Sequence, residues 1–485
     1  MKKPWALSIV LTLLGAGGGF AAQAPDNTLE TWPQFRGPGG LGVGAAHARP
    51  PVHFGPDTNV IWRVPVPSGN SSPIVWGRHI ILTGFADGKL TTQSLDRDTG
   101  REAWRREVAP EKVEEVHQSL GNPASATPVT DGLRVYVHFG SFGMLAYDLE
   151  GKEVWRRPMS LTQTEYGASS SPILIGDHLF QLLDQDGGSH LIALNKRTGE
   201  VAWRVERPEM RRGFGTPIAW EHDGETDLVV PGTIWLKGLD PRTGAERWRV
   251  SGLARITCTS PVVGGGQLFT ASWTTGGDRN TEHITMPSFD EFIAKHDQDK
   301  DGKFRYDELP PGPMKQRFKH LDGNRSGFVE RAEWDTMAEI FARVENQAFA
   351  VRPDGRGGVS DAGVTWRFKK GLPYVASPVY YRDRFYMVKN GGMLTCLNPL
   401  TGVALYQEER VGGMGDYYAS LVAADGRIYV ASQRGVLTVV KAGDAFEILA
   451  TNDLKESTHA SPVPIGDRLI VRTAGHLAAF QEGVR

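Results

Sequence analysis

A short phrase recurs eight times along the 485 residues of this chain. In each copy a small residue is followed by proline and two or three apolar residues, then by a turn and a strand with alternating aromatic residues. The copies are centred on Pro73, Pro128, Pro172, Pro217, Pro261, Pro378, Leu421 and Pro462, with leucine replacing proline in the seventh. Most copies lie about 40–45 residues apart, which is the spacing of the four-stranded blades of β-propellers.

Each copy predicts four short strands. A second apolar strand follows the phrase, as at 134–137. A third strand ends in a Thr-Gly turn, as at 99–100 and 198–199, and a tryptophan such as Trp104 or Trp203 follows in a fourth strand. Glycine accepts the positive φ that such a turn requires. We expect the tryptophan to bury its ring against the neighbouring blade.

The repeat therefore predicts an all-β fold, an eight-bladed β-propeller. The last copy ends after its third strand at 476–480, whereas residues 59–64 form an unattached strand before the first copy. We expect that strand to complete the last blade, because an open ring would leave an exposed sheet edge. Blades 1–5 and the closing strand then occupy residues 59–273. The remainder of blade 5 and blades 6–8 occupy residues 345–485.

Residues 95–104 (LDRDTGREAW) and 194–203 (LNKRTGEVAW) resemble the repeats of the PQQ-like, or quinoprotein alcohol dehydrogenase-like, β-propeller superfamily. The opening at 32–38 (WPQFRGP) resembles the start of a bacterial exported branch of it. The resemblance covers about residues 32–485 apart from one insertion. It implies the propeller fold, whereas its functional implication is broad because one fold hosts many functions.

The N-terminus has the pattern of an export signal over residues 1–24. A basic start at Met1–Lys3 precedes an apolar run at 5–14, and Ala22-Gln23-Ala24 fits the small-x-small cleavage rule, with Ala21 as an alternative site. An uncleaved membrane anchor is the competing interpretation, but the apolar run is short for a span. We expect a periplasmic or secreted protein with no transmembrane segment after cleavage, and an N-terminal arm over residues 25–58.

The composition of the chain limits the classes of partner that it could bind. The formal net charge of −2 argues against a nucleic-acid or anionic-membrane binder, because such proteins usually carry a basic excess. Only two cysteines are present, Cys258 and Cys396, in different repeats. We expect both to be buried structural thiols, since a core of this size needs no disulfide.

The interval between the fifth and sixth copies is longer than its neighbours by about 70 residues, and we assign the excess to an insertion over residues 274–344. The segment 297–308 (DQDKDGKFRYDE) fits the calcium-binding loop of an EF-hand. The predicted ligands are the carboxylates of Asp297, Asp299, Asp301 and Glu308 and the backbone carbonyl of Lys303. Phe304 is expected to pair with a sister loop.

That sister loop follows at 322–333 (DGNRSGFVERAE). Its predicted ligands are Asp322, Asn324, Ser326, the carbonyl of Phe328, Glu330 directly or through water, and Glu333. Oxygen ligands of this number and spacing suit Ca²⁺ better than Mg²⁺ or zinc. Because prolines at 310, 311 and 313 shorten the intervening helix, the small all-α EF-hand pair is expected to be a structural calcium staple rather than an opening sensor.

Three functions remain. The first is an exported calcium-binding propeller that acts as a binding or scaffold protein for a protein or glycan partner. An assembly-factor role, as in the outer-membrane assembly lipoprotein that shares this type of propeller, is another, although the missing lipobox cysteine counts against a direct equivalent. The third is a PQQ-dependent dehydrogenase that oxidises alcohols or sugars. The resemblance implies a pair of adjacent cysteines near the cofactor of such enzymes, and this chain lacks that pair. PQQ is therefore possible but not favoured, and we identify no catalytic residues.

Propeller geometry also predicts where a small-molecule site would lie. Residues just before each first strand are expected to face the central channel, where charged and aromatic groups could bind a polar ligand. These residues are Asn70, Asn122, Glu165, Tyr166, Arg212, Arg255, Tyr374, Asp416, Tyr417 and His459. The competing interpretation is a solvated channel mouth.

Overall fold

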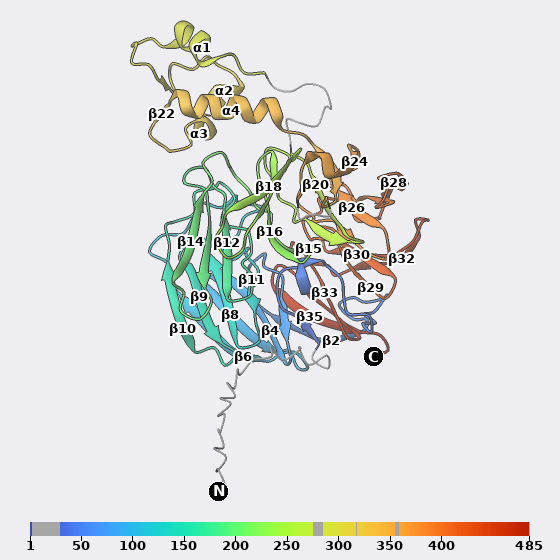
Figure 1. Ribbon diagram of the computed structural model, residues 1–485. Coiled ribbons are helices and arrows are strands. Elements are labelled where there is room, and N and C mark those ends of the chain that lie inside the picture. The colour runs from blue at the N-terminus through green and yellow to red at the C-terminus, as the bar shows by residue number, and fades with distance from the viewer. Residues whose placement is uncertain (2–29, 275–284, 317, 355–357, 485) are drawn as a thin grey trace.

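The computed structural model contains eight antiparallel blade sheets, seven with four strands and one with a fifth strand added at its edge, and Figure 1 shows them arranged around a central axis. It describes the chain outside residues 2–29, 275–284, 317, 355–357 and 485. The predicted eight-bladed β-propeller is therefore confirmed. The predicted export signal lies outside the described residues, apart from Met1. No helix in the described part of the chain is long and apolar enough to cross a membrane.

Blades 1 to 4 follow one another along the chain, and the strands of each are joined in sequence order. Blade 1 contains β3 (Ile74–Trp76), β4 (His79–Ala86), β5 (Lys89–Asp96) and β6 (Glu102–Val108), with β1 (Thr31–Trp32) beside β3. Blade 2 contains β7 (Val129–Thr130), β8 (Arg134–Phe139), β9 (Gly143–Asp148) and β10 (Glu153–Pro158). Blade 3 contains β11 (Ile173–Ile175), β12 (His178–Leu183), β13 (His190–Asn195) and β14 (Val201–Glu206). Blade 4 contains β15 (Ile218–His222), β16 (Glu225–Pro231), β17 (Trp235–Leu239) and β18 (Glu246–Ser251).

Blades 5 to 8 complete the ring. Blade 5 contains β19 (Val262–Gly264), β20 (Gln267–Ser272), β23 (Gln347–Val351) and β24 (Val364–Phe368). Blade 6 contains β25 (Val379–Tyr380), β26 (Phe385–Lys389), β27 (Met393–Leu397) and β28 (Ala404–Arg410). Blade 7 contains β29 (Val422–Ala424), β30 (Arg427–Ala431), β31 (Val436–Lys441) and β32 (Ile448–Asp453). Blade 8 contains β33 (Val463–Ile465), β34 (Arg468–Arg472) and β35 (His476–Gln481), and β2 (Val60–Pro65) pairs with β35 as its fourth strand. The strand before the first repeat thus closes the ring, as expected.

A closed circle of hydrogen bonds joins the eight blades at their inner ends. In each repeat, the backbone N–H of the Ser or Thr donates to the hydroxyl of the Ser or Thr in the next blade, at 2.9–3.0 Å. The final bond runs from Ser461 back to Ser72. The members are Ser72, Thr127, Ser171, Thr216, Ser260, Ser377, Ser420 and Ser461, and all are buried. We call this circle the hydroxyl belt. Each blade is therefore held to the next without a shared sheet.

A second link between blades lies at their outer edges. The indole N–H of Trp104 donates to the carbonyl of Leu149 in blade 2 at 2.7 Å, and that of Trp155 donates to Lys196 in blade 3 at 3.0 Å. A Cβ at Gly151, in the turn of blade 2, would overlap the Trp104 ring. The expected burial of each tryptophan against the neighbouring blade is thus confirmed at these positions. The Trp104 ring packs directly against Gly151, which has no side chain to block it.

The N-terminal arm crosses the end of the channel at which the inner strands finish. It reaches blades 2, 7 and 8 through backbone hydrogen bonds from Thr130 to Pro33, from Gly44 to Ala423 and from Arg49 to Gly466. The Arg36 side chain is fully buried, and its guanidinium donates to the carbonyl of Pro378 in blade 6. A 3₁₀ turn (Pro38–Gly40) lies between these contacts. The arm therefore plugs this end of the channel.

The insertion leaves blade 5 after β20 and returns at β23, which are hydrogen-bonded neighbours in one sheet. It contains α1 (Phe289–His296), β21 (Phe304–Arg305), α2 (Pro313–Gln316), α3 (Phe318–Leu321), β22 (Phe328–Val329) and α4 (Arg331–Arg343). A further 3₁₀ turn (Asp361–Gly363) precedes β24. In Figure 1 the insertion, drawn in yellow and gold, lies over one end of the propeller, away from the N-terminal arm. Asn346 clamps its base by exchanging two hydrogen bonds with the backbone of Thr274.

The hydroxyl belt can be tested with Ser171→Ala. The substitution removes the acceptor of the Thr127 N–H, and a buried donor left without a partner costs about 1–3 kcal/mol. Denaturant unfolding should show a loss of that size in the free energy of unfolding. Ser169→Ala is the matched control, because Ser169 lies in the same loop and makes no side-chain hydrogen bond within the described residues. If the two variants were equally stable, the hydrogen bonds of the hydroxyl belt would not contribute to the stability of the ring.

Candidate metal centre and propeller mouth

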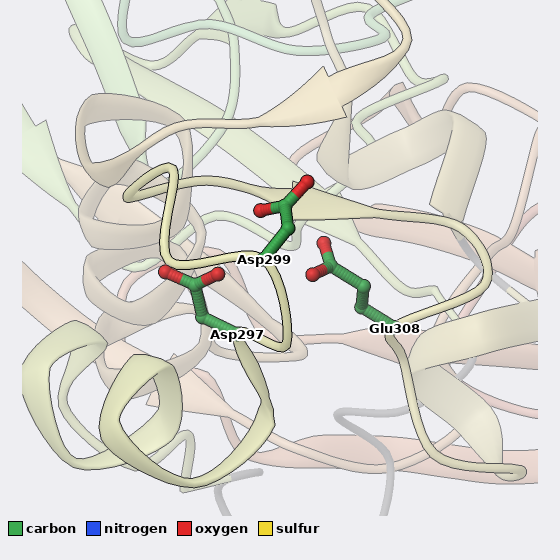
Figure 2. A group of neighbouring side chains, drawn as sticks. All are labelled: Asp297, Asp299 and Glu308. Carbon is green, nitrogen blue, oxygen red and sulfur yellow. The ribbon is translucent and has the colours of Figure 1, made fainter.

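The first predicted calcium loop forms a cup of carboxylates between α1 and α2. Oxygen atoms of Asp297, Asp299 and Glu308 lie within 4.8 Å of one another, and Figure 2 shows the three carboxylates converging. Backbone N–H groups hold them there. Gly302 donates to Asp297 at 3.0 Å, and Arg305 donates to Glu308 at 2.8 Å. Gly302 has φ 82°, the left-handed conformation that glycine adopts without strain.

The second loop repeats the conformation of the first. Gly327 has φ 92° and donates to Asp322 at 2.9 Å, as Gly302 does to Asp297. The N–H of Glu330 donates to Glu333 at 3.1 Å, and the N–H of Ser326 donates to Asn324 at 2.8 Å. Two stretches with different sequences therefore share the glycine-centred turn that orients the first Asp and the backbone hydrogen bond that orients the last Glu.

A small aromatic core holds the two loops together. The strands β21 and β22 pair so that Phe304 lies opposite Val329, the pairing predicted from the first loop. Phe304 also contacts the rings of Phe292 and Trp334 at 4.9 and 5.6 Å between centroids. A capping box begins α1, with the side chains of Ser288 and Glu291 each accepting a hydrogen bond from the other's backbone N–H. The two loops are thus joined to each other and to the helices that flank them by this core.

Several predicted ligands have other partners in this structure. Glu330 forms an ion pair with Lys303 at 2.8 Å, and the carbonyl of Phe328 accepts from Ser326 at 3.0 Å. Asp301 and Asp299 both lie near the Arg305 guanidinium, at 3.1 and 3.4 Å. Long cationic side chains at the loop surface can move away when an ion binds, because such exposed pairs contribute little stability. Glu308, Asp322 and Glu333 are buried carboxylates and make no such pair.

Ion pairs connect the second loop to blades 3 and 4. Arg325 lies 3.6 Å from Asp186, and Asp186 also accepts two hydrogen bonds from Arg212 at 2.5 and 3.1 Å. The other side of Arg212 donates to Glu165 at 2.7 Å, and His320 of α3 lies 3.6 Å from the same carboxylate. Burial of the Arg212 guanidinium has a desolvation cost that lowers its pKa. The two neighbouring carboxylates more than offset this cost, so the pKa of Arg212 is raised. The insertion is therefore docked on the propeller as well as tethered to it.

Blade 4 also contributes to the hydrophobic core of the insertion. Ile234 is buried within the same cluster as Phe289 and Trp334, and Trp235 packs against it. The backbone of Ile234 has φ 66°, a conformation that β-branched residues rarely adopt. The guanidinium of Arg343 in α4 lies 4.5 Å from the Trp235 ring centroid. Strain at Ile234 is thus compensated by packing that exists only when the insertion is docked.

The channel mouth lies at the end of the propeller where the insertion is docked. Tyr166, Tyr374 and Tyr418 lie in the segments that precede the first strands of blades 3, 6 and 7. Burial raises the pKa of Tyr418, and its hydrogen bond to Asp416 raises it further. Tyr418 stacks on His459 at 5.5 Å between centroids. Tyr166 stacks in the same way on His117 at 5.2 Å. Half-buried aromatic rings therefore line the mouth.

One predicted channel residue is misplaced. Tyr417 is buried between blades 6 and 7, and its hydroxyl donates to the carbonyl of Gly413 at 2.7 Å. The neighbouring Tyr418 faces the mouth instead, because successive side chains of an extended segment point in opposite directions. Arg212 was also expected to be available to a ligand, but its guanidinium forms ion pairs with Asp186 and Glu165.

The remaining predicted residues of the mouth are distributed as follows. Asn70, Asn122 and His459 line one polar pocket. Asp416 accepts a hydrogen bond from the Tyr418 hydroxyl at 2.9 Å. Burial raises the pKa of both Tyr166 and Tyr374, and the positive charge of Arg255 offsets part of that rise. The mouth predicted from the repeat thus exists, although its members divide between ion pairs, aromatic stacks and a pocket.

Sequence reasoning missed a buried carboxyl beside the mouth. Glu114, in the connection between blades 1 and 2, is 3% exposed and accepts from the N–H of Ala168 at 2.9 Å. Its other oxygen has no partner within the described residues. Burial raises the pKa of Glu114 to about 8. No motif surrounds this residue, so only the tertiary structure reveals it.

Glu114 predicts a pH dependence of stability. Its pKa in the folded state exceeds the usual 4.5, so the folded protein binds the proton more tightly and loses stability as pH rises from about 4.5 to about 8. Glu114→Gln should remove this loss in the free energy of unfolding, which amounts to about 1.4 kcal/mol for each pH unit between the unfolded and folded pKa values. Thermal unfolding at pH 5 and pH 8.5 checks it: the gain should be larger at pH 8.5. A pH-independent difference would contradict the assignment. Glu115→Gln, at the exposed neighbour, is the control.

The ring of eight repeated blades, with its interlocked tryptophans and open mouth, defines a PQQ-like β-propeller. The chain belongs to the family described as outer membrane protein assembly factor BamB, which matches residues 55–183, 162–276 and 345–483. The matched segments stop and resume around the insertion, which is therefore additional to the family's propeller. No curated protein matches the chain.

Three solved structures are similar to this chain at low sequence identity. The crystal structure of BamB from Moraxella catarrhalis is 13% identical, with a TM-score of 0.55, and the match covers 87% of this chain and 99% of that one. The computationally designed Ika8 protein is 11% identical, with a TM-score of 0.46, and the match covers 86% and 99%. A europium-containing methanol dehydrogenase is 10% identical, with a TM-score of 0.44, and the match covers 93% and 98%. The similarity to BamB supports the fold.

Proposed function

We propose that this protein is an exported binding or scaffold propeller stabilised by two calcium ions in its EF-hand insertion. The observation that supports the proposal is the duplicated loop: two different sequences form the same glycine-centred turn, and in each the glycine N–H donates to the Asp at the first position of the loop. Carboxylate, amide, hydroxyl and carbonyl oxygens are the ligands that Ca²⁺ prefers. The donor set of each loop therefore fits the ion.

In the first loop, Asp297, Asp299, Asp301, Glu308 and the Lys303 carbonyl would hold the ion. In the second loop the corresponding ligands would be Asp322, Asn324, Ser326, Glu333 and the Phe328 carbonyl, with Glu330 binding directly or through water. The bound ion would supply the positive charge that the buried carboxylates lack. Glu308 and Glu333 already lie at the loop ends, each oriented by two backbone N–H groups.

A structural role for calcium fits this insertion better than a sensor role. Sensor EF-hands expose a groove by swinging long helices apart, whereas α2 and α3 are four residues each. The base is clamped by Asn346, and the second loop is joined to blade 3 through Asp186. Ordering the loops would therefore strengthen the insertion's contact with the propeller rather than release a surface.

A binding role for the propeller is supported by the family and by the mouth. The family's description is that of an assembly factor, and the chain's net charge of −2 disfavours nucleic acid as the partner. We infer a protein or glycan partner in the periplasm or outside the cell. PQQ-dependent oxidation of alcohols or sugars is the alternative, and Cys258 and Cys396 argue against it because they lie in blades 5 and 6 as separate thiols. Cys396 is buried as expected, whereas Cys258 is only half-buried, so the expectation is wrong for that residue. Desolvation raises the pKa of both thiols to about 12.

Calcium stabilisation is tested by calorimetric titration and thermal unfolding of the chelator-treated mature protein. We expect two sites and a rise in melting temperature with calcium concentration, because a ligand that binds only the folded state stabilises it. Combining Glu308→Gln with Glu333→Gln should abolish that rise. Glu339→Gln, on the exposed face of α4 and outside both loops, should retain it. If the double variant gains as much from calcium as the parent, the loops are not the calcium sites.

The dehydrogenase alternative is tested by adding PQQ to the calcium-loaded protein. We expect no change in the absorbance of PQQ and no dye-linked oxidation of alcohols or sugars. Calorimetry on the same sample should give no saturable heat of binding. Saturable binding accompanied by an absorbance change would overturn the scaffold proposal and favour the quinoprotein.

A further inference from the structure

We propose that the propeller mouth binds one neutral sugar ring in the pocket between blades 8, 1 and 2. The inference rests on the binding role proposed above but not on calcium, because no residue of the insertion lines this pocket.

The pocket has a volume of about 200 Å³. Ser68 and Asn70 lie before the first strand of blade 1, Gln118 and Asn122 lie in the connection to blade 2, and His459 lies before blade 8. Pockets for drug-sized ligands range from about 300 to 1,000 Å³, so this one suits a single small ring. Its lining side chains are mostly amides and hydroxyls, which pair with a polyol rather than with an apolar ligand.

The amide groups are held in fixed orientations. Asn122 donates to the Ser68 hydroxyl at 3.1 Å and accepts from the N–H of Ala124 at 2.8 Å. Asn70 donates to the carbonyl of Leu120 at 3.0 Å. This leaves the Asn70 side-chain oxygen without a donor within the described residues. Oriented groups lose little entropy when they bind, so they can select the hydroxyl pattern of a ligand.

The pocket borders an aromatic surface. His459 belongs to its lining and stacks on Tyr418, with ring planes 24° apart. Burial lowers the pKa of His459, so its imidazole is neutral at pH 7. A sugar ring combines apolar C–H faces with polar edges, and an aromatic ring beside amide groups offers both kinds of contact.

The charge of the pocket favours a neutral ligand. Arg472 is the one Lys, Arg, Asp or Glu side chain among the described lining residues, and it is 1% exposed. Its guanidinium donates to the carbonyls of Ser71 and Pro67, both at 2.9 Å, and lies behind Gly69, where a Cβ would collide with it. The arginine therefore joins blade 8 to blade 1 and does not present its charge to the pocket.

The experiment is ligand-observed saturation-transfer NMR on the calcium-loaded mature protein. The probes are glucose, galactose, mannose and N-acetylglucosamine, with glucuronate as the charged match of glucose. We expect at least one neutral sugar to bind. Asn70→Ala and His459→Ala should each weaken that binding about tenfold or more, the equivalent of losing one hydrogen bond or one ring contact. His53→Ala, at an exposed histidine outside the pocket, is the control.

Three outcomes would overturn the proposal: no neutral sugar binds, binding survives both pocket substitutions, or glucuronate binds more tightly than glucose in a salt-dependent way. The last result would mark an anion site. Thermal unfolding of each variant confirms that it is folded. Calcium titration of the same proteins separates the two proposals, because intact calcium sites with no sugar binding would contradict only this one.

Discussion

The architecture depends on eight buried hydroxyls that accept hydrogen bonds from one blade and belong to the next. A propeller blade is a complete sheet, so nothing in its strand pairing connects it to its neighbours. The hydroxyl belt supplies that connection at the axis, and the chain closes it when Ser461 donates to Ser72. Proline follows seven of these residues and has no N–H to satisfy. In the seventh repeat, Leu421 does have an N–H, and it points to the carbonyl of Ser377.

The belt also determines where a binding surface can form. Because it fixes the start of each inner strand, the loops before those strands converge on one end of the channel. The other end is filled by the N-terminal arm, whose buried Arg36 reaches blade 6. A ligand therefore approaches from the end that carries the insertion. The pocket lies where blades 8, 1 and 2 meet, close to the point at which β2 closes the ring.

The insertion breaks the symmetry of the ring without disturbing it. Since β20 and β23 are neighbours in one sheet, an excursion between them leaves the blade's four strands intact. The insertion is nevertheless not independent of the propeller. It shares a hydrophobic cluster with Ile234 of blade 4, and an ion-pair network joins Arg325 to Asp186 of blade 3. Any free energy gained by ordering its loops is therefore transmitted to three blades.

The sequence by itself determined the all-β repeat, the count of eight blades, the closing strand and the two acidic loops, because each is a local pattern with a fixed period or spacing. It also placed Phe304 against the second loop correctly.

The tertiary structure alone decided what depends on residues far apart in the chain. The repeat showed serine and threonine before each proline, but only the assembled ring shows their hydroxyls bonded in a circle. Tyr417 and Tyr418 differ by one position, and the direction of a short extended segment decided which faces the mouth. No sequence motif surrounds Glu114 or the pocket residues around Asn70. Glu114 and the pocket are enclosed only where several blades meet, and the segments that meet there are far apart in the sequence.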